Sequence, residues 1–184
     1  MKNIRYYLLF LTCVLTVGIV YAEDPVRAWG QLQVKGNQLC NEAGKPVSLR
    51  GVSYGWHNLW PRFYNKHSVK WLKEDWHCTV LRAAMGTVIE DNYIENPEFA
   101  LECINKVVKA AINVIIDWHT YYPQKAEAKK FFGMMSEKYG KYPHVIYEIY
   151  NEPMKDTWDE VKEYACEIIK EIRKHDPDNV ILVG

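Results

Sequence analysis

The chain has 184 residues and no net formal charge, since 23 basic side chains balance 23 acidic ones. This length fits one domain of roughly 100–200 residues, and the even charge argues against a nucleic-acid partner, which would need a basic surface. Apolar residues make up 48% of the chain, enough for a packed core. Most of the seven Trp and thirteen Tyr side chains are expected in that core. The alternative for an exposed one is stacking on the C–H face of a sugar ring.

The first 22 residues predict a signal peptide. Lys2 and Arg5 form a positive start, an uncharged apolar run covers Tyr6 to Val20, and Val20-Tyr21-Ala22 matches the small-residue pattern before a cleavage site. The apolar run has about 15 residues, fewer than the roughly 20 that a membrane-spanning helix needs. We therefore expect a protein secreted to the periplasm or the extracellular space, with residues 23–184 as its mature part. No stable membrane anchor is expected after cleavage.

The cysteines after this segment are widely spaced and include no C-x-x-C pair: Cys40, Cys78, Cys103 and Cys166. Such spacing argues against zinc, and we expect neither a metal nor another cofactor. We predict these cysteines as small buried apolar residues. A disulfide is the alternative in an exported protein, and the sequence leaves its pairing open.

The mature chain begins with a hairpin and then alternates between strand and helix patterns. Gln31–Val47 is predicted as the β-hairpin, with turns at 35–37 and 42–45. The elements predicted after it are a strand at Leu49–Tyr54, a helix at Ser68–Asp75 capped by Ser68, a strand at Thr79–Met85, a helix from Asn96-Pro97 to Ala111, a strand at Asn113–Trp118, a helix at Gln124–Tyr139, a strand at His144–Tyr150, a helix opened by the capping box Thr157–Glu160, and a strand at Asn179–Val183.

Apolar side chains at helical spacing indicate which helix faces are buried. The helix at Gln124–Tyr139 is expected to bury Phe131, Phe132 and Met135. The apolar stripe predicted for the last helix consists of Trp158, Val161, Ala165, Ile168, Ile169 and Ile172.

The alternation predicts an α/β fold with a mainly parallel sheet and helices outside it. Two closures are compatible with the pattern, a doubly wound open sheet and a (β/α)8 barrel. A barrel has about 250 residues and would need three further units after Gly184. The segment Gly51–Gly55 lacks the third glycine of a dinucleotide-binding loop and does not open a helix, so such a site has little support.

Polar side chains follow the carboxyl ends of several predicted strands, where a barrel places its active site. Arg82, His119 and the pair Asn151-Glu152 fall at equivalent places in three strands. Each alone has a structural alternative, such as an ion pair or a helix cap, but Thr157 already fills the cap position after Glu152. Asn151 carries an amide that can hydrogen bond to a sugar hydroxyl.

These strand ends resemble glycoside hydrolase family 5, in its bacterial endoglucanase branch. The resemblance covers nearly all of the chain from about Gln31 onward and is carried by Lys70–Trp76, Val80–Met85, Val114–His119, Val145–Pro153 and Asp176–Gly184. It implies a (β/α)8 barrel, truncated here after about five strands, that hydrolyses β-1,4-glucan with retention of configuration. The implied partner is a polysaccharide, cellulose or a related β-glucan.

The resemblance also implies roles for individual residues. Glu152 matches the general acid/base, Asn151 the residue that holds the sugar 2-hydroxyl, and Arg82 the residue that orients the nucleophilic carboxylate. His119 matches a residue that lines the same site. The substrate-binding candidates are His57, Trp60 and Tyr121.

The chain departs from the family pattern in three places. The family nucleophile is a Glu at the end of strand seven, and no residue of this chain matches it. Neither Glu148 nor Asp117 has the right placement to replace it, since Glu148 is about 13 Å along the strand from Glu152, at roughly 3.3 Å per residue. The predicted helix runs straight into the strand between Ala111 and Val114. Gly86 stands where the family often has an aromatic residue, so one sugar contact is expected to differ.

Two alternatives to this hydrolase function are compatible with the same residues. One is a half-barrel that binds carbohydrate without cutting it, and the other is a non-functional product of a truncated reading frame.

Overall fold

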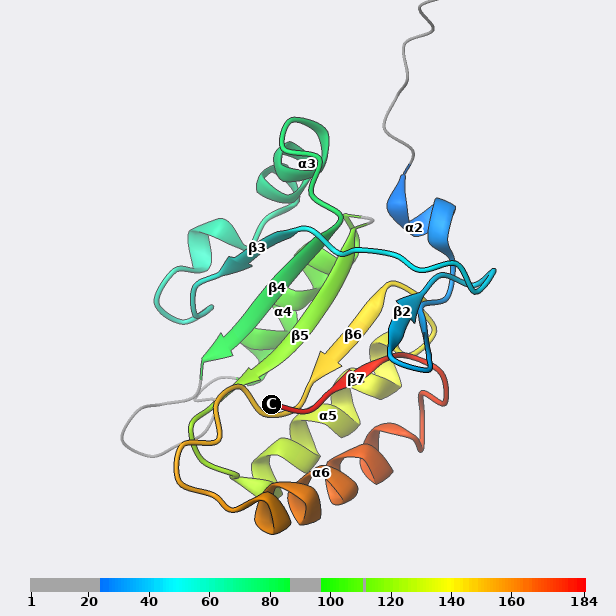
Figure 1. Cartoon of the computed structure of the whole chain (residues 1–184). Helices are drawn as coiled ribbons and strands as arrows, with labels where there is room; N and C mark the ends of the chain where they lie inside the picture. The colour runs from blue at the N-terminus through cyan, green and yellow to red at the C-terminus, as the bar shows by residue number, and fades with distance from the viewer. Residues whose placement is uncertain (1–23, 87–96, 111) are drawn as a thin grey trace, which may run out of the picture.

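The computed structural model describes residues 24–86, 97–110 and 112–184 (Figure 1). The predicted signal peptide and Asn96, the first residue of a predicted helix, lie outside these residues. The elements in chain order are α2 (Pro25–Trp29), β1 (Gln33–Lys35), β2 (Gln38–Cys40), β3 (Gly51–Tyr54), η1 (Pro61–Phe63), α3 (Lys66–Glu74), β4 (Val80–Gly86), α4 (Pro97–Val108), β5 (Asn113–His119), α5 (Lys125–Tyr139), β6 (Val145–Glu148), α6 (Trp158–Ile172) and β7 (Ile181–Leu182).

The main sheet is parallel and follows the order of the chain. Its five strands pair as β3-β4-β5-β6-β7, so each strand lies beside the one before it. Helices connect β3 to β4 and each later pair of strands, which is the pattern that the alternation predicted. Parallel neighbours need such crossovers because a short turn can only join antiparallel strands. The fold is therefore an α/β unit of the kind from which a (β/α)8 barrel is built.

The register of the strands separates a helix-facing side from an open side. Arg82 pairs with Ser53 and Ile115, and Asp117 pairs with Ala84 and Glu148. Because alternate residues of a strand point to opposite faces, the side chains of Arg82, Asp117 and Glu148 share one face. Their immediate neighbours in sequence face the other way, toward the helices.

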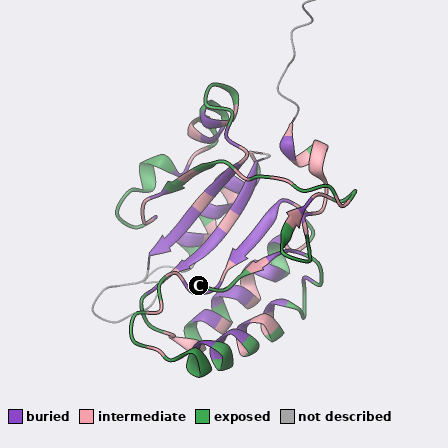
Figure 2. Ribbon diagram, in the orientation of Figure 1, coloured by how far each residue is buried: buried purple, intermediate pink, exposed green. Residues whose placement is uncertain are grey.

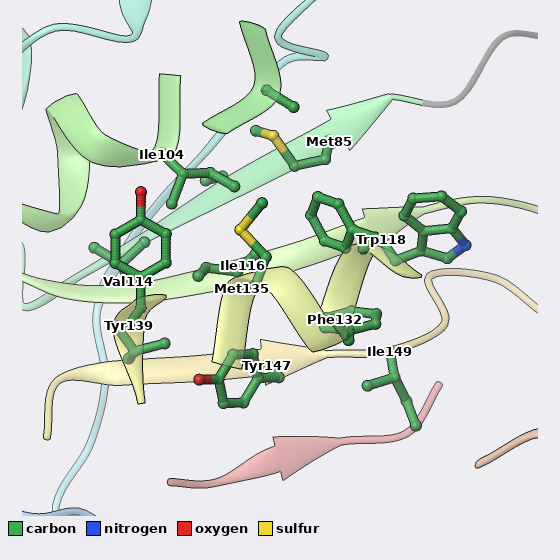
Figure 3. Packing of buried hydrophobic residues seen from close by; sticks show 14 of the residues in the cluster. Met85, Ile104, Val114, Ile116, Trp118, Phe132, Met135, Tyr139, Tyr147 and Ile149 are labelled. Carbon is green, nitrogen blue, oxygen red and sulfur yellow. The ribbon is translucent and has the colours of Figure 1, made fainter. Parts of the chain in front are cut away.

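The helix-facing side of the sheet forms the main hydrophobic core. Figure 3 shows Trp118 of β5 and Phe132 and Met135 of α5 among the buried side chains between the sheet and the helices. All three are buried, with at most 1% of their surface exposed. The burial of Phe131, Phe132 and Met135 predicted from helical spacing is confirmed, and Figure 2 shows β4, β5 and β6 as the most continuously buried strands.

A smaller apolar cluster closes the amino-terminal end of the open face. The predicted hairpin is confirmed as β1 and β2, which pair antiparallel, with a further bridge between Cys40 and Pro46. Leu32, next to this hairpin, packs with Ile146 and Val180, and Ile115 lies against the same cluster. The carboxyl-terminal half of the open face, which carries the charged residues, is left outside this apolar cover.

Three expectations for the helices are corrected. Asn65, rather than Ser68, caps α3, because its side chain accepts hydrogen bonds from the main-chain N–H groups of His67 and Ser68. The helix α4 ends at Val108, and residues 109–110 form a turn, so the helix does not run straight into β5. Trp158 is 69% exposed, because it lies in the first turn of α6, which Figure 2 shows as solvent-exposed.

The last strand and the cysteines also differ from expectation. The strand predicted at Asn179–Val183 is limited to Ile181–Leu182, because Asn179 bonds instead to Asp176 and to main-chain carbonyls of the α5–β6 turn. Cys40, Cys78 and Cys103 are buried free thiols, as predicted, whereas Cys166 is exposed on α6. In the three described ranges, no helix is both long enough and apolar enough to span a membrane.

Candidate active site

Arg82 is the centre of a charged cluster on the open face of the sheet. It lies in the middle of β4 rather than at its end, and its long side chain reaches the residues at the ends of β5 and β6. Two of its nitrogens donate to the two carboxylate oxygens of Glu148, each at 2.7 Å. The same guanidinium lies 2.9 Å from the carboxylate of Asp117. Two-pronged pairing of this kind fixes the plane of the guanidinium as well as its position.

Asp117 also sets the orientation of His119. The Nδ1 atom of His119 lies 2.7 Å from Oδ2 of Asp117, and a carboxylate can only accept, so Nδ1 carries the hydrogen. Nδ1 is also 3.4 Å from a nitrogen of Arg82, and because both atoms are then donors, that approach is not a hydrogen bond. The remaining ring nitrogen, Nε2, is left as the acceptor for a hydroxyl group.

Burial and charge work in opposite directions in this cluster. Burial raises the pKa of Asp117 to about 6, although the hydrogen bond from His119 and the charge of Arg82 act to lower it. Burial alone would lower the pKa of Arg82, but the bond and charge of Glu148 and the charge of Asp117 outweigh it, and the pKa is raised. Arg82 therefore remains charged, and it is shared between two carboxylates.

Asn151 is held by this cluster with one end of its amide unused. Nη2 of Arg82 donates to Oδ1 of Asn151 at 2.7 Å, which turns the Nδ2 group away from Arg82. That Nδ2 is buried and has no hydrogen-bond partner among the described residues. A buried donor without a partner is costly, and an acceptor atom of a ligand would satisfy it.

Glu152 follows directly and is exposed. Its main-chain N–H donates to the carbonyl of Thr120 at 3.3 Å, which ties the segment after β6 to the segment after β5. The structure thus brings Arg82, His119 and Asn151 into one bonded cluster and places Glu152 next to it in the chain.

The other predicted site residues differ in their exposure and in whether they contact this cluster. Tyr121 is 37% exposed and meets the ring of His119 edge-on, with 6.2 Å between ring centroids. Trp60 is 43% exposed. His57 is not brought to the surface. It is only 2% exposed, its ring lies against Phe99, and burial lowers its pKa to about 4.

Asp117 and Glu148 are partners of Arg82, a role that sequence reasoning missed because it weighed them only as substitutes for the nucleophile. The signal was present in the spacing. Asp117 stands two residues before His119, so period-two alternation places both on one face, and Glu148 lies on that face through its pairing with Asp117. Across the described ranges, no group of three or more His, Cys, Asp or Glu side chains could hold a metal ion.

Comparison with known proteins matches most of the chain to one family. The model of the cellulase family, glycosyl hydrolase family 5, matches residues 40–184. An endoglucanase from Clostridium saccharobutylicum is 47% identical over 169 residues, which is 84% of this chain and 37% of that protein. Endoglucanase Z from Dickeya dadantii is 40% identical over 190 residues, covering 96% of this chain and 44% of that protein.

Solved structures show the same fold and the same partial overlap. A structure from Cytophaga hutchinsonii matches with a TM-score of 0.83 and 43% identity, over 88% of this chain and 55% of that one. The catalytic domain of an endoglucanase from Thermobifida fusca matches with a TM-score of 0.81 and 36% identity, over the same shares. It has also been solved in complex with cellotetraose. The chain thus spans about two fifths of the curated relatives it matches and about half of the solved chains.

Proposed function

This chain belongs to the cellulase family, glycosyl hydrolase family 5, and we propose that it supplies the acid/base half of an active site that hydrolyses β-1,4-glucan with retention of configuration. The observation that carries this proposal is the arrangement around Asn151. Arg82 holds the oxygen of its amide, its nitrogen is buried without a described partner, and the exposed carboxyl group of Glu152 is the next side chain. The donor and the carboxyl group can therefore meet one sugar residue from the same side.

In the proposed reaction Glu152 moves the protons. Its carboxyl group donates a proton to the glycosidic oxygen as a nucleophilic carboxylate bonds to the anomeric carbon and the bond between that carbon and the oxygen breaks. In the second step its carboxylate takes a proton from the water that attacks the anomeric carbon and releases the retained sugar. Nδ2 of Asn151 donates to the 2-hydroxyl of that sugar, and Nε2 of His119 accepts from another hydroxyl group.

A retaining enzyme also needs a nucleophilic carboxylate about 5–5.5 Å from the acid. Asp117 and Glu148 are poorly suited, because each is already engaged by Arg82 and Asp117 is fully buried. We propose that the nucleophile comes from residues outside this chain, in the part of its relatives that the chain does not span. Without that carboxylate no glycosyl–enzyme intermediate forms, so residues 1–184 alone are expected to be inactive.

A joined protein tests this proposal directly. The matching carboxyl-terminal part of the Clostridium saccharobutylicum endoglucanase would be attached after Gly184, and release of reducing sugar from carboxymethylcellulose would be measured. We expect activity in the joined protein and none in the 184-residue chain. Glu152→Gln in the joined protein should lower the rate by about 10²–10⁴-fold, the usual contribution of general acid catalysis. A dinitrophenyl glycoside, whose leaving group needs no proton, should lose much less in the first step.

Two results would count against the proposal. Equal losses on both substrates would show that Glu152 is not the acid. A joined protein that binds glucan but does not cleave it would favour the non-catalytic binding function.

We also propose that the protein is exported and that it binds its polysaccharide outside the cytoplasm. The support is the charged start, the short apolar run and the Val20-Tyr21-Ala22 ending of the first 22 residues. Amino-terminal sequencing of exported material should give a start near Glu23. A start at Met1 in the membrane fraction would contradict this.

A further inference from the structure

The loop that carries Glu152 joins β6 to α6 and is closed by one hydrogen bond. The hydroxyl group of Tyr150 donates to Oδ2 of Asp156 at 2.5 Å. Glu152 lies between these two residues in the chain, and Asp156 directly precedes Thr157, which caps α6. Because Glu152 is exposed, packing does not fix its side chain, and its place depends on the path of the main chain. The bond between Tyr150 and Asp156 restricts that path.

The Tyr150 end of this bond is anchored in the core. Tyr150 and Tyr164 are both buried, with at most 1% of their surface exposed, and their ring centroids are 5.2 Å apart. The hydroxyl group of Tyr164, which lies on α6, donates to the carbonyl of Ile149 at 2.7 Å. Burial and the bond to Asp156 raise the pKa of Tyr150 well above its usual value, so its hydroxyl group keeps the proton that it donates. The loop thus starts from a fixed point.

The segment at the end of β7 contacts the start of the same loop. The N–H of Ile149 donates to the carbonyl of Leu182 at 3.0 Å. A Cβ atom built on Gly184 would overlap the carbonyl oxygen of Tyr150 and would lie 3.0 Å from that of Asn151. Figure 1 shows the chain after β7 beside the loop that follows β6. The start of the loop is therefore held by β7 as well as by α6.

The other end of the loop has less support from packing. Met154 and Lys155 are exposed, and Asp156 is only partly buried. In such a segment few contacts offset the conformational entropy of an ordered main chain. The hydrogen bond from Tyr150 is therefore the contact that ties this end of the loop to the buried core.

We infer that Tyr150 and Asp156 are positioning residues for the carboxyl group of Glu152. The inference rests on the proposed function, in which Glu152 protonates the glycosidic oxygen. Proton transfer needs the acid within about 2.6–3.2 Å of that oxygen, and a displacement of about 1 Å can lower a rate about 10²-fold. Without the bond the loop samples more conformations, and fewer molecules hold the acid within reach. Asn151 is held independently by Arg82, so binding of the sugar should change little.

The test compares Asp156→Leu with Asp156→Asn in the joined protein. Both replacements are close to Asp in size, but only Asn keeps an oxygen that can accept from the Tyr150 hydroxyl group. We expect Asp156→Leu to lower kcat on carboxymethylcellulose about tenfold with KM within about twofold, and Asp156→Asn to keep kcat within about threefold of the wild type. On the dinitrophenyl glycoside, whose leaving group needs no proton, Asp156→Leu should lose less than about threefold in the first step.

Three further measurements separate a positioning role from a general loss of structure. Tyr150→Phe removes the other half of the bond but keeps the buried ring, so it should match Asp156→Leu, and the double variant should lose no more than either single variant. In the 184-residue protein, amide hydrogen exchange over residues 151–156 should be faster in Asp156→Leu than in Asp156→Asn. The matched control, Asp159→Leu, removes an exposed carboxylate in the first turn of α6 and should change neither the rate nor this exchange.

Equal kcat or equal exchange in Asp156→Leu and Asp156→Asn would overturn the inference while the proposed function stands. So would a loss in Asp156→Leu that is the same on both substrates, because the effect would then not act through proton donation. If Glu152→Gln itself loses equally on both substrates, the proposed function and the inference fall together. Thermal melts show whether each variant folds, and Tyr150→Phe decides the question if Asp156→Leu does not.

Discussion

Replacing Glu148 by Gln perturbs the charge cluster with almost no change of shape. In the native protein the two carboxylate oxygens of Glu148 each accept from Arg82 at 2.7 Å. Gln keeps one oxygen but presents an N–H group where the second stood, so one hydrogen bond disappears and two donors face each other. The guanidinium keeps its contacts with Asp117 at 2.9 Å and with Asn151 at 2.7 Å, so Arg82 is not left entirely without a counter-charge.

The size of the effect follows from the burial of the pair and from the single hydrogen bond that the substitution removes. The side chains of Arg82 and Glu148 are 21% and 15% exposed. A hydrogen bond to a charged group contributes about 1.5–3 kcal/mol, and breaking a fully buried ion pair costs about 3–5 kcal/mol. Because only one bond is removed, some water reaches the pair, and Asp117 still compensates Arg82, we expect Glu148→Gln to lower the free energy of unfolding by about 2 kcal/mol.

Urea denaturation followed by circular dichroism measures this, since urea, unlike guanidinium chloride, does not screen charge. The control is Glu74→Gln, which breaks the Lys70–Glu74 pair of 3.7 Å between side chains that are 67% and 58% exposed. An exposed pair of this kind contributes about 0–1 kcal/mol. If Glu148→Gln and Glu74→Gln lower the free energy of unfolding by the same small amount, Arg82 does not depend on Glu148 and our account of the cluster is wrong.

Three further predictions concern other parts of the chain. Burial raises the pKa of Asp117 to about 6 from an unfolded value near 3.8, so the folded state holds this proton more tightly. As pH rises from 4 to 6, the free energy of unfolding of the wild type should therefore fall by up to about 3 kcal/mol relative to that of Asp117→Asn. Parallel pH–stability curves for the two proteins would contradict this. Thr157→Ala removes the capping box with Glu160 at the start of α6 and should cost about 1 kcal/mol in urea denaturation, an effect that Thr157→Ser should largely avoid. A thiol reagent should label Cys166 in the native protein while Cys40, Cys78 and Cys103 stay protected, and mass spectrometry of the labelled peptides would reveal any other order of reactivity.

The alternation of strands and helices could be predicted from sequence because each element has a strong local signal. Buried runs such as Val114–Ile116 and the capping box at Thr157 depend on residues within a few positions of one another. The cap of α3 was less certain, since Asn65 and Ser68 are both good capping residues. Only the structure shows that Ser68 is engaged elsewhere, with its hydroxyl group beside the Tyr54 hydroxyl and the Phe63 carbonyl.

The site was predicted less completely than the fold, because its contacts join residues far apart in sequence. Arg82 meets Glu148 and Asn151, which lie 66 and 69 positions away. Placing His119 and Asn151 together required only that parallel strands end at one edge of the sheet, whereas Arg82 lies within β4 and joins them through its long side chain. Recognising that Asp117 and Glu148 share the guanidinium required the register, which decides whether the side chains face each other or opposite sides.

The shared guanidinium also restricts how this sequence can diverge. Lysine at position 82 would keep the charge, but a single ammonium group lacks the planar fork that lets Arg82 meet Glu148 with two parallel bonds and still reach Asn151. Loss of one carboxylate would leave the charge of Arg82 less compensated. Loss of Arg82 would leave the largely buried carboxylates of Asp117 and Glu148 repelling each other. Single substitutions at positions 82, 117 and 148 should therefore be rare among descendants of this sequence, and changes there should arise together. These three positions lie on three separate strands, yet they would evolve as one unit.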